Sequence, residues 1–333
     1  MRGKRLNPNS LIKTLGKIIV SAGLLAFLLT RISLGSVVEQ IGGLDPRVCT
    51  LAVAVFFLSN VISSWQWHQL LVSSGVSLPF HRAFRFYFVG LFFNNFLPAN
   101  IGGDAVKVYD VTRLGSSAYQ VIAVTLLDRL IGIFSLCLIA SFCLLFLLKV
   151  FTVGTLLGYL AIFVGCMTPV LGFYFIEPLG KILRRLVGRM KLFSISARGT
   201  SILDNLGEFK SRKPLILKLI FVSIVIQALR VSTHILIAVA LGVQLDGVAI
   251  TLFFVFVPLL SLAMIPPITI NGLGVREGLG ILLFAQAGIG QTDAFTIEFL
   301  TYLVSVSVSL LGLIFFLMRR EGRREPTPDS TAI

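Results

Sequence analysis

Two short patterns in the chain combine residues that break a helix with a cation that could bind an anionic group. The first runs from Pro98 to Lys107 and the second from Pro267 to Arg276; both match Pro-x4-Gly-x3-Lys/Arg, 169 residues apart. Backbone that leaves a helix in an apolar region must be buried in protein or line a water-filled cavity. A half-helix that starts after such a break directs free N–H groups and its positive dipole end at one point, which favours an anion. The predicted break residues are Pro98, Gly102 and Gly103 in the first pattern and Pro267, Asn271, Gly272 and Gly274 in the second.

Basic residues within or beside the apolar segments are candidates for binding a phosphate. A charge at membrane depth is costly and usually faces a cavity or a partner. Arg230 shares one helical face with Gln227 and His234, because the three are spaced i, i+3 and i+7. Such a stripe suits an anionic group such as a lipid phosphate; the alternative is an internal ion pair that holds helices together. The candidate cations are Lys107, Arg129, Arg230 and Arg276.

Acidic residues lie close to the same positions and are candidates for orienting the cations or for coupling. Asp104 and Glu277 follow the two breaks, where each either caps its own helix, pairs with a cation or carries a coupling proton. Asp128 opens the apolar segment 130–148. Glu298 begins a polar stripe that either lines a path or supplies hydrogen bonds between helices; its other members are Tyr302, Ser305 and Ser309.

Composition places these residues in a polytopic membrane protein. Of 333 residues, 56 % are hydrophobic and 13 % charged, whereas a soluble domain is about half apolar and about a quarter charged. The chain has no P-loop, zinc-binding helix or nucleophile elbow, and its four cysteines lack metal-ligand spacing. We therefore predict no catalytic, metal or cofactor site. Six apolar stretches are each about long enough to cross a bilayer as a helix: 12–30, 49–72, 130–148, 152–176, 215–241 and 296–318.

The distribution of basic residues predicts the orientation of these spans. The formal net charge is +14, and the bases concentrate in residues 1–17, 177–214 and 319–324. The positive-inside rule assigns all three segments to the cytoplasm. We therefore expect a multi-pass protein of the plasma (inner) membrane with both termini cytoplasmic. The bases flank spans instead of forming one patch, which indicates contact with anionic lipid and not with nucleic acid.

The spans and the two breaks arrange as two similar halves. Regions 83–120 and 248–288 are each predicted to form a re-entrant hairpin with its tip at a break. A shift of 169 residues brings span 49–72 onto span 215–241. Three crossings per half is an odd number, so we predict inverted repeats, an architecture that recurs in transporters.

This count gives an all-α protein with six full crossings and two hairpins. In a competing count, 248–265 and 274–290 are full spans and the protein has eight crossings. Either way, 1–318 forms a single membrane domain and 319–333 a disordered cytoplasmic tail. The two repeats are expected at about 11–148 and about 150–318.

Two further patterns predict packing instead of a site. Gly154 and Gly158 form Gly-x3-Gly, which is typical of closely packed membrane helices. Trp65 and Trp67 are expected in the aromatic belt at a membrane interface.

Several of these residues occur together in an order that matches one family. They are Phe93-Asn-Asn-Phe-Leu-Pro98, Gly102-Gly103-Asp104, Asp128-Arg129 and Asn271-Gly-Leu-Gly-Val-Arg-Glu277. The combination resembles the membrane region of lysylphosphatidylglycerol synthases and the stand-alone flippase-like proteins that share it, over nearly the whole chain. In the full-length synthases this region is understood to flip aminoacylated phosphatidylglycerol, which a cytosolic domain makes. This chain ends at Ile333, soon after its last span, so the resemblance does not imply aminoacyl transfer. Lys107 stands where the family is expected to have arginine.

The residues and the resemblance together imply a non-enzymatic protein that moves an anionic lipid or lipid-linked headgroup between leaflets. The two tips would form the headgroup site, with the four cations on the phosphate and the acids orienting them. The lipid stays open between an anionic phospholipid and a polyprenyl or hopanoid-type lipid. Without an ATP site, movement is either downhill or coupled to an ion gradient. Two alternatives are a non-catalytic subunit of a lipid-modifying or glycosyltransferase pathway, and an ion-coupled carrier of a small soluble anion.

Overall fold

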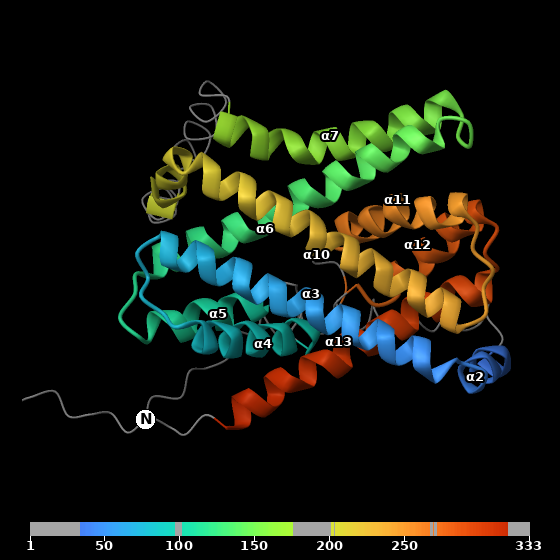
Figure 1. Ribbon diagram of the computed structural model, residues 1–333, viewed down its shortest axis with the longest axis horizontal. Helices are drawn as coiled ribbons and strands as arrows, with labels where there is room; N and C mark the ends of the chain where they lie inside the picture. The colour runs from blue at the N-terminus through green and yellow to red at the C-terminus, as the bar shows by residue number, and fades with distance from the viewer. Residues whose placement is uncertain are drawn as a thin grey trace, which may run out of the picture.

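The computed structural model describes residues 34–96, 102–175, 201–202, 204–266, 269 and 272–318. Every regular element in these ranges is a helix (Figure 1). Several predictions therefore fall outside the described residues. They concern the span 12–30, the break residues Pro98, Pro267 and Asn271, the basic segment 177–200 and the tail 319–333.

Four helices are long and apolar enough to cross a membrane: α3 (Pro46–Ser73), α6 (Ala118–Leu144), α10 (Lys213–Ala240) and α13 (Gln291–Leu317). They correspond to four of the predicted spans, and α7 (Val153–Phe175) corresponds to a fifth. The shorter elements are α2 (Leu34–Gly42) and the 3-10 turns η1 (Leu145–Leu147), η2 (Phe209–Ser211) and η3 (Ala285–Ala287). The described chain is thus an all-helical bundle with several membrane-length helices.

The start of α6 differs from the predicted span. The prediction placed Asp128 and Arg129 at its opening, but the helix begins at Ala118 and both residues lie well inside it. Gly115 has a φ of 95°, which turns the chain after the preceding helix, and Ser117, with an extended backbone, occupies the N-cap position of α6. The prediction was wrong because a hydropathy window starts a span where polar residues end, whereas a helix starts where the backbone turns.

Two pairs of short helices flank the two breaks. The first pair is α4 (Phe80–Phe96) and α5 (Gly102–Thr112), which pack against each other; the second is α11 (Gly247–Ala263) and α12 (Val275–Phe284). Figure 1 shows α4 and α5 at one end of the long helices and α11 and α12 at the other. The two pairs therefore reach their breaks from opposite ends of the bundle.

Helix lengths repeat along the chain. Helices α3 and α10 both have 28 residues, α4 and α11 both have 17, and α6 and α13 both have 27, while α5 has 11 and α12 has 10. The helices before the break recur 167 residues later, from Pro46 to Lys213, and those after it recur 173 residues later, from Ala118 to Gln291. The second break is thus six residues longer than the first, and the predicted uniform shift of 169 falls between the two values.

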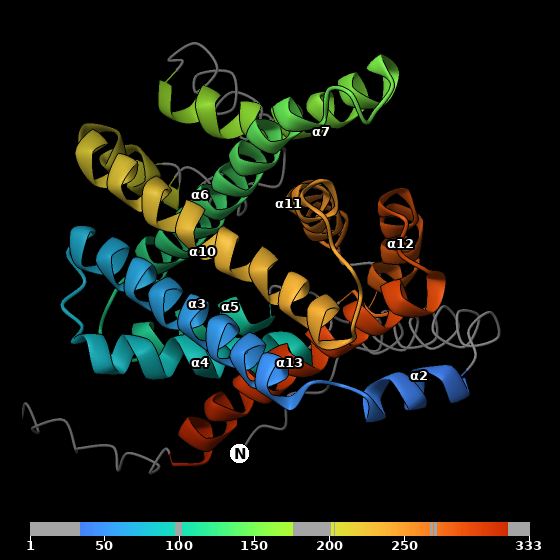
Figure 2. The same ribbon diagram turned by 45° about the vertical axis from the view of Figure 1, so that its right-hand side comes forward.

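Helices of one half of the chain pack against helices of the other half. Helix α4 packs on α13, and its counterpart α11 packs on α6; α3 packs along α10 between them. In Figure 2, α3 and α10 run side by side through the centre of the molecule. Two apolar cores fill the two ends, one around Trp67, Phe88 and Leu127, the other around Phe253 and Phe284. Each end of the bundle therefore holds one helix pair and one core.

Candidate functional site

The first break leads into a helix whose first turn is held by polar side chains. Helix α5 begins at Gly102. The backbone N–H of Gly103 lies in its first turn and donates to Asn94 Oδ1 of α4 at 2.8 Å. Asp104, the third residue of α5, accepts from Lys107 Nζ at 2.8 Å and also pairs with Arg129 of α6. Asp104 and Lys107 are buried, whereas the Arg129 side chain is 41 % exposed. Asp104 therefore pairs two cations from two helices.

Aromatic rings enclose Lys107. Its ammonium lies 5.0 Å from the ring centroid of Tyr87 and 5.4 Å from that of Trp67, within the range of a cation–π interaction. Trp67 is fully buried and its indole N–H donates to Thr125 Oγ1 at 3.3 Å. The aromatic-belt prediction was therefore wrong for Trp67, because its polar atom bonds inside the bundle. The Lys107 stem passes over Gly90, where a Cβ would lie 2.6 Å from Lys107 Cγ.

Helices α3 and α10 extend this cluster across the bundle. Asp128 accepts from Gln66 Nε2 at 2.9 Å and lies within electrostatic range of Lys107 and Arg230. Arg230 in turn reaches Ser63 Oγ of α3 at 3.3 Å. Of the predicted stripe on α10, Arg230 thus points toward the first cluster. We name Asp104, Lys107, Asp128, Arg129 and Arg230 the first site.

The second break leads into α12 through two glycines in the left-handed region, Gly272 with a φ of 76° and Gly274 with a φ of 84°. A Cβ on Gly272 would also lie 2.5 Å from Met264 Sδ. Glu277, the third residue of α12, accepts from the backbone N–H of Gly274 and from Arg276, both at 2.7 Å. Glu277 therefore caps its helix and pairs with a cation at once.

Arg276 also reaches α13. Its Nε lies 3.4 Å from Glu298 Oε2, and its guanidinium carbon lies 4.9 Å from the ring centroid of Tyr302. On the other side of the same carboxylate, His234 Nε2 of α10 lies 3.5 Å from Glu298 Oε1. A Cβ on Gly280 would lie 2.8 Å from Glu298 Cγ, so glycine is what makes room for this side chain. We name His234, Arg276, Glu277 and Glu298 the second site.

A cavity of about 190 Å³ opens beside the second site. Arg276, Glu298 and His234 supply its charged and titratable groups, and hydroxyls come from α11 and α13. Apolar side chains of α3 and α11 form the rest of its wall. The lining residues outside the second site are Phe56, Val257, Leu260, Ser261, Met264, Thr301 and Ser305.

Helix α10 joins the two sites. Arg230 belongs to the first and His234, one turn later, to the second; His234 Nδ1 lies 3.1 Å from the carbonyl oxygen of Arg230. Three cations meet two acids at the first site, with Asp110 buried one turn further along α5. One arginine meets two acids at the second. The two sites are thus connected in space through α10, and the second site holds more acids than arginines.

The structure brings the predicted charged residues together in two groups, and they are surrounded by side chains that the sequence reasoning did not predict. All eight predicted charged residues lie in one or the other site, and Gly102, Gly103, Gly272 and Gly274 lie at the breaks. The missed partners have neutral side chains. These partners are Ser63, Gln66 and Tyr87. For Ser63 and Gln66, the sequence offered one indication: each is a polar residue inside the apolar span 49–72.

Comparisons with known proteins agree on one family. The chain is 23 % identical to the UPF0104 membrane protein PH1989 of Pyrococcus horikoshii, over 91 % of this chain and 96 % of the relative. It is 24 % identical to the UPF0104 membrane protein MJ1595 of Methanocaldococcus jannaschii, over 90 % and 93 % of the two chains. No solved structure matches the chain significantly. Residues 14–312 match the model of the lysylphosphatidylglycerol synthase TM region. With its membrane-length helices, the chain is an integral membrane protein, and it belongs to the lysylphosphatidylglycerol synthase TM region family.

Proposed function

We propose that this protein moves an anionic lipid headgroup between the two leaflets of the plasma membrane. The observation that carries the proposal is the pair of broken helices that enter the bundle from opposite ends, each with a charged site at its break. Lipid cannot satisfy charged groups or free backbone N–H groups, so such a break belongs beside a polar path. Broken helices that meet near the midplane carry the substrate site in many transporters.

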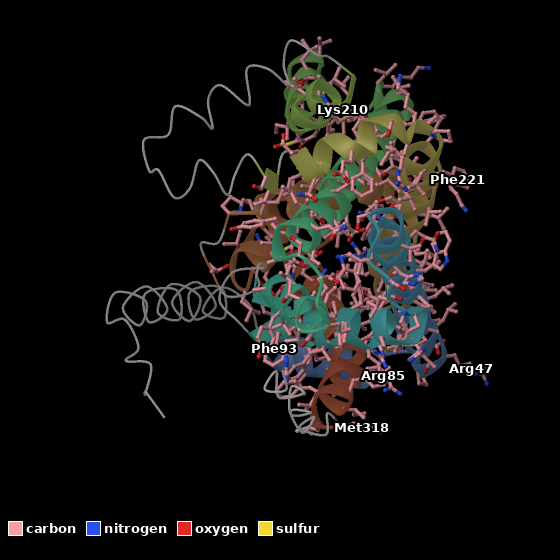
Figure 3. The ribbon with its side chains drawn as sticks, turned by 90° about the vertical axis from the view of Figure 1, so that its left-hand side faces the viewer. Arg47, Arg85, Phe93, Lys210, Phe221 and Met318 are labelled. Carbon is pink, nitrogen blue, oxygen red and sulfur yellow. The ribbon has the colours of Figure 1, made fainter. Side chains whose placement is uncertain are left out.

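The proposed topology has six full crossings, two re-entrant pairs and inverted repeats. It is supported by the equal helix lengths and by the exchanged contacts of α4 with α13 and of α11 with α6. Among the described residues, bases gather at the end of the bundle where α4 starts. Figure 3 faces this end, with Arg85 near the bottom and Lys210 near the top. The opposite end carries the acids Asp45, Asp246 and Asp293. The positive-inside rule therefore places the α4–α5 end, and both termini, in the cytoplasm.

Within this topology the first site is the phosphate-binding site for a lipid from the cytoplasmic leaflet. Arg129 is its most exposed cation, and a guanidinium offers a phosphate two parallel donors. Lys107 is buried behind Asp104 and holds that carboxylate in place. Arg230 continues the positive charge toward the second site, where Arg276 is the next cation along the path.

The test is leaflet exchange of fluorescent phosphatidylglycerol in proteoliposomes at equal pH on both sides. The wild type is expected to exchange the lipid well above empty vesicles, and Arg129→Gln at least fivefold more slowly, because one charge-assisted phosphate contact contributes about 1.5–3 kcal/mol. Arg113→Gln is the matched control, because it removes the same charge from a residue outside both sites whose guanidinium lies over the Tyr109 ring.

Two results would contradict the proposal. Exchange no faster than in empty vesicles, for anionic and zwitterionic lipids alike, would reject lipid movement and favour a lipid-presenting subunit or a carrier of small anions. Equal loss in Arg129→Gln and in Arg113→Gln would reject the first site as the phosphate-binding site.

A further inference from the structure

Glu298 is a fully buried carboxylate that lines the cavity without a hydrogen bond. Its side chain is 0 % exposed, and neither of its oxygens has a hydrogen-bond partner in the described part of the chain. Its nearest neighbours are Arg276 Nε at 3.4 Å and His234 Nε2 at 3.5 Å. Both exceed the usual hydrogen-bond range of about 2.7–3.2 Å. A buried acid in this position calls for one more bound group.

The backbone fixes which nitrogen of His234 faces Glu298. Nδ1 lies 3.1 Å from the carbonyl oxygen of Arg230, and a carbonyl oxygen only accepts, so Nδ1 carries a hydrogen. In the neutral imidazole Nε2 then has a lone pair, and that lone pair faces Glu298 Oε1. An ionised carboxylate oxygen also only accepts. The two atoms can bond only when one proton lies between them.

The charges of the second site lead to the same conclusion. Glu277 is satisfied, because it accepts from Arg276 and from the Gly274 backbone at 2.7 Å each. Arg276 compensates one carboxylate, and Glu298 is the second. With a neutral His234, the second site carries one net negative charge in an apolar wall. One added proton makes it neutral, which lowers the cost of burying it.

The helices packed on α13 supply no other cation to Glu298 among the described residues. From α10 come His234 and, one turn earlier, Arg230, which reaches Ser63; from α12 come Arg276 and Glu277. Helix α3 contributes Phe56 to the cavity. Helix α4 meets α13 with Arg85 at Phe315, five turns away, and α2 meets it with Gln40 at Asp293 and Thr296.

We propose that Glu298 and His234 bind one proton between them and that this proton moves together with the lipid. The proposal rests on the lipid movement proposed above. With the proton bound, Glu298 no longer competes for Arg276, whose guanidinium lines the cavity and can bind a phosphate. When the proton leaves, the Glu298 carboxylate takes the place of the phosphate. Proton and headgroup therefore strengthen each other's binding, and one proton with one monoanionic lipid moves no net charge.

The test adds a pH difference to the proteoliposome assay. Valinomycin and equal potassium on both sides hold the membrane potential at zero. A difference of one pH unit is expected to concentrate phosphatidylglycerol about tenfold in the leaflet on the alkaline side, because one proton per lipid converts the proton ratio into a lipid ratio. A potassium diffusion potential at equal pH is expected to leave the lipid distribution unchanged.

Glu298→Gln tests whether lipid movement depends on the protonation of Glu298. It keeps the shape of the side chain but cannot ionise, so the variant is expected to exchange lipid with no pH bias and with a new response to the potential. His234→Gln, which removes the base from the same pair, is expected to abolish the pH bias as well. Glu208→Gln, at an exposed acid, is the control and should keep the wild-type bias.

The outcomes distinguish the two proposals. A wild type that exchanges lipid without a pH bias overturns proton coupling and leaves lipid movement standing. A bias that persists in Glu298→Gln overturns the assignment of the proton to this pair. A wild type that exchanges no lipid rejects the proposed function and the coupling with it.

Discussion

Asp104 and Lys107 show how a membrane-buried ion pair is held by more than its two charges. Asp104 has a second cation in Arg129, and Lys107 has the rings of Trp67 and Tyr87. Breaking a buried pair from one side costs more than removing both partners, because the remaining charge is left without compensation. At this pair, Arg129 reduces that cost on the acidic side.

Lys107→Met is therefore expected to lower the free energy of unfolding by about 3 kcal/mol, the lower end for a broken buried pair. The double variant Asp104→Asn/Lys107→Met should lose about 1–3 kcal/mol less than the sum of the single losses, because each single change removes the same interaction. Equilibrium unfolding in detergent micelles measures all three. Lys218→Met, at an exposed cation beside Trp65, is the control. Additive losses would show that Asp104 and Lys107 do not interact.

At the scale of elements, glycines decide where helices approach closely. Gly312 of α13 lies against the backbone of Phe88 in α4, where an added Cβ would overlap the Phe88 carbonyl and lie 2.9 Å from Phe92 Cβ. Gly103 of α5 meets the Gly90 carbonyl of α4 in the same way. A Cβ on Gly158 of α7, part of the pattern predicted to pack closely, would meet no other part of the described structure within 4 Å. The spacing of two glycines in one helix does not show which helix packs on it.

Gly312→Ala is expected to push α4 away from α13 and to destabilise the protein by about 1–3 kcal/mol, as overpacking of a tight contact does. Gly158→Ala is the matched control and should be neutral or slightly stabilising, because alanine favours the helix over glycine. Thermal unfolding in the same detergent compares the two. Equal melting temperatures for Gly312→Ala and the wild type would contradict the close crossing of α4 and α13.

The difference between local patterns and contacts between helices explains how much of the fold and of the two sites the sequence predicts. Apolar runs locate the long helices, because a membrane span is recognised from the hydropathy of its own residues alone. The breaks are visible too, because prolines and glycines cluster there in otherwise apolar sequence. The pairing of Glu298 with His234 and the cage around Lys107 are not, because they join α13 with α10 and α5 with α3 and α4. Those contacts depend on how the helices cross, which no local pattern contains.

At the scale of the whole molecule, the two broken pairs give a topology that labelling can test. In the proposed arrangement α4 and α5 enter and leave on the cytoplasmic side, so the loops 74–79 and 113–117 face the same compartment, and the loops 241–246 and 285–290 face the opposite one. Single cysteines at the exposed residues Ser77, Ser117, Gln244 and Ala285 report on these four loops in a chain whose native cysteines are changed to serine.

A membrane-impermeant maleimide applied to intact cells is expected to label Gln244→Cys and Ala285→Cys at once, and Ser77→Cys and Ser117→Cys only after permeabilisation. The reason is geometric: 17 residues in α4 and 11 in α5 span about 26 Å and about 17 Å, so neither helix alone crosses about 30 Å of hydrocarbon. Labelling of Ser117→Cys from outside with Ser77→Cys protected would make the α4–α5 pair a full crossing. That result would also remove the inverted relation between the halves, because the number of crossings in the first half would become even.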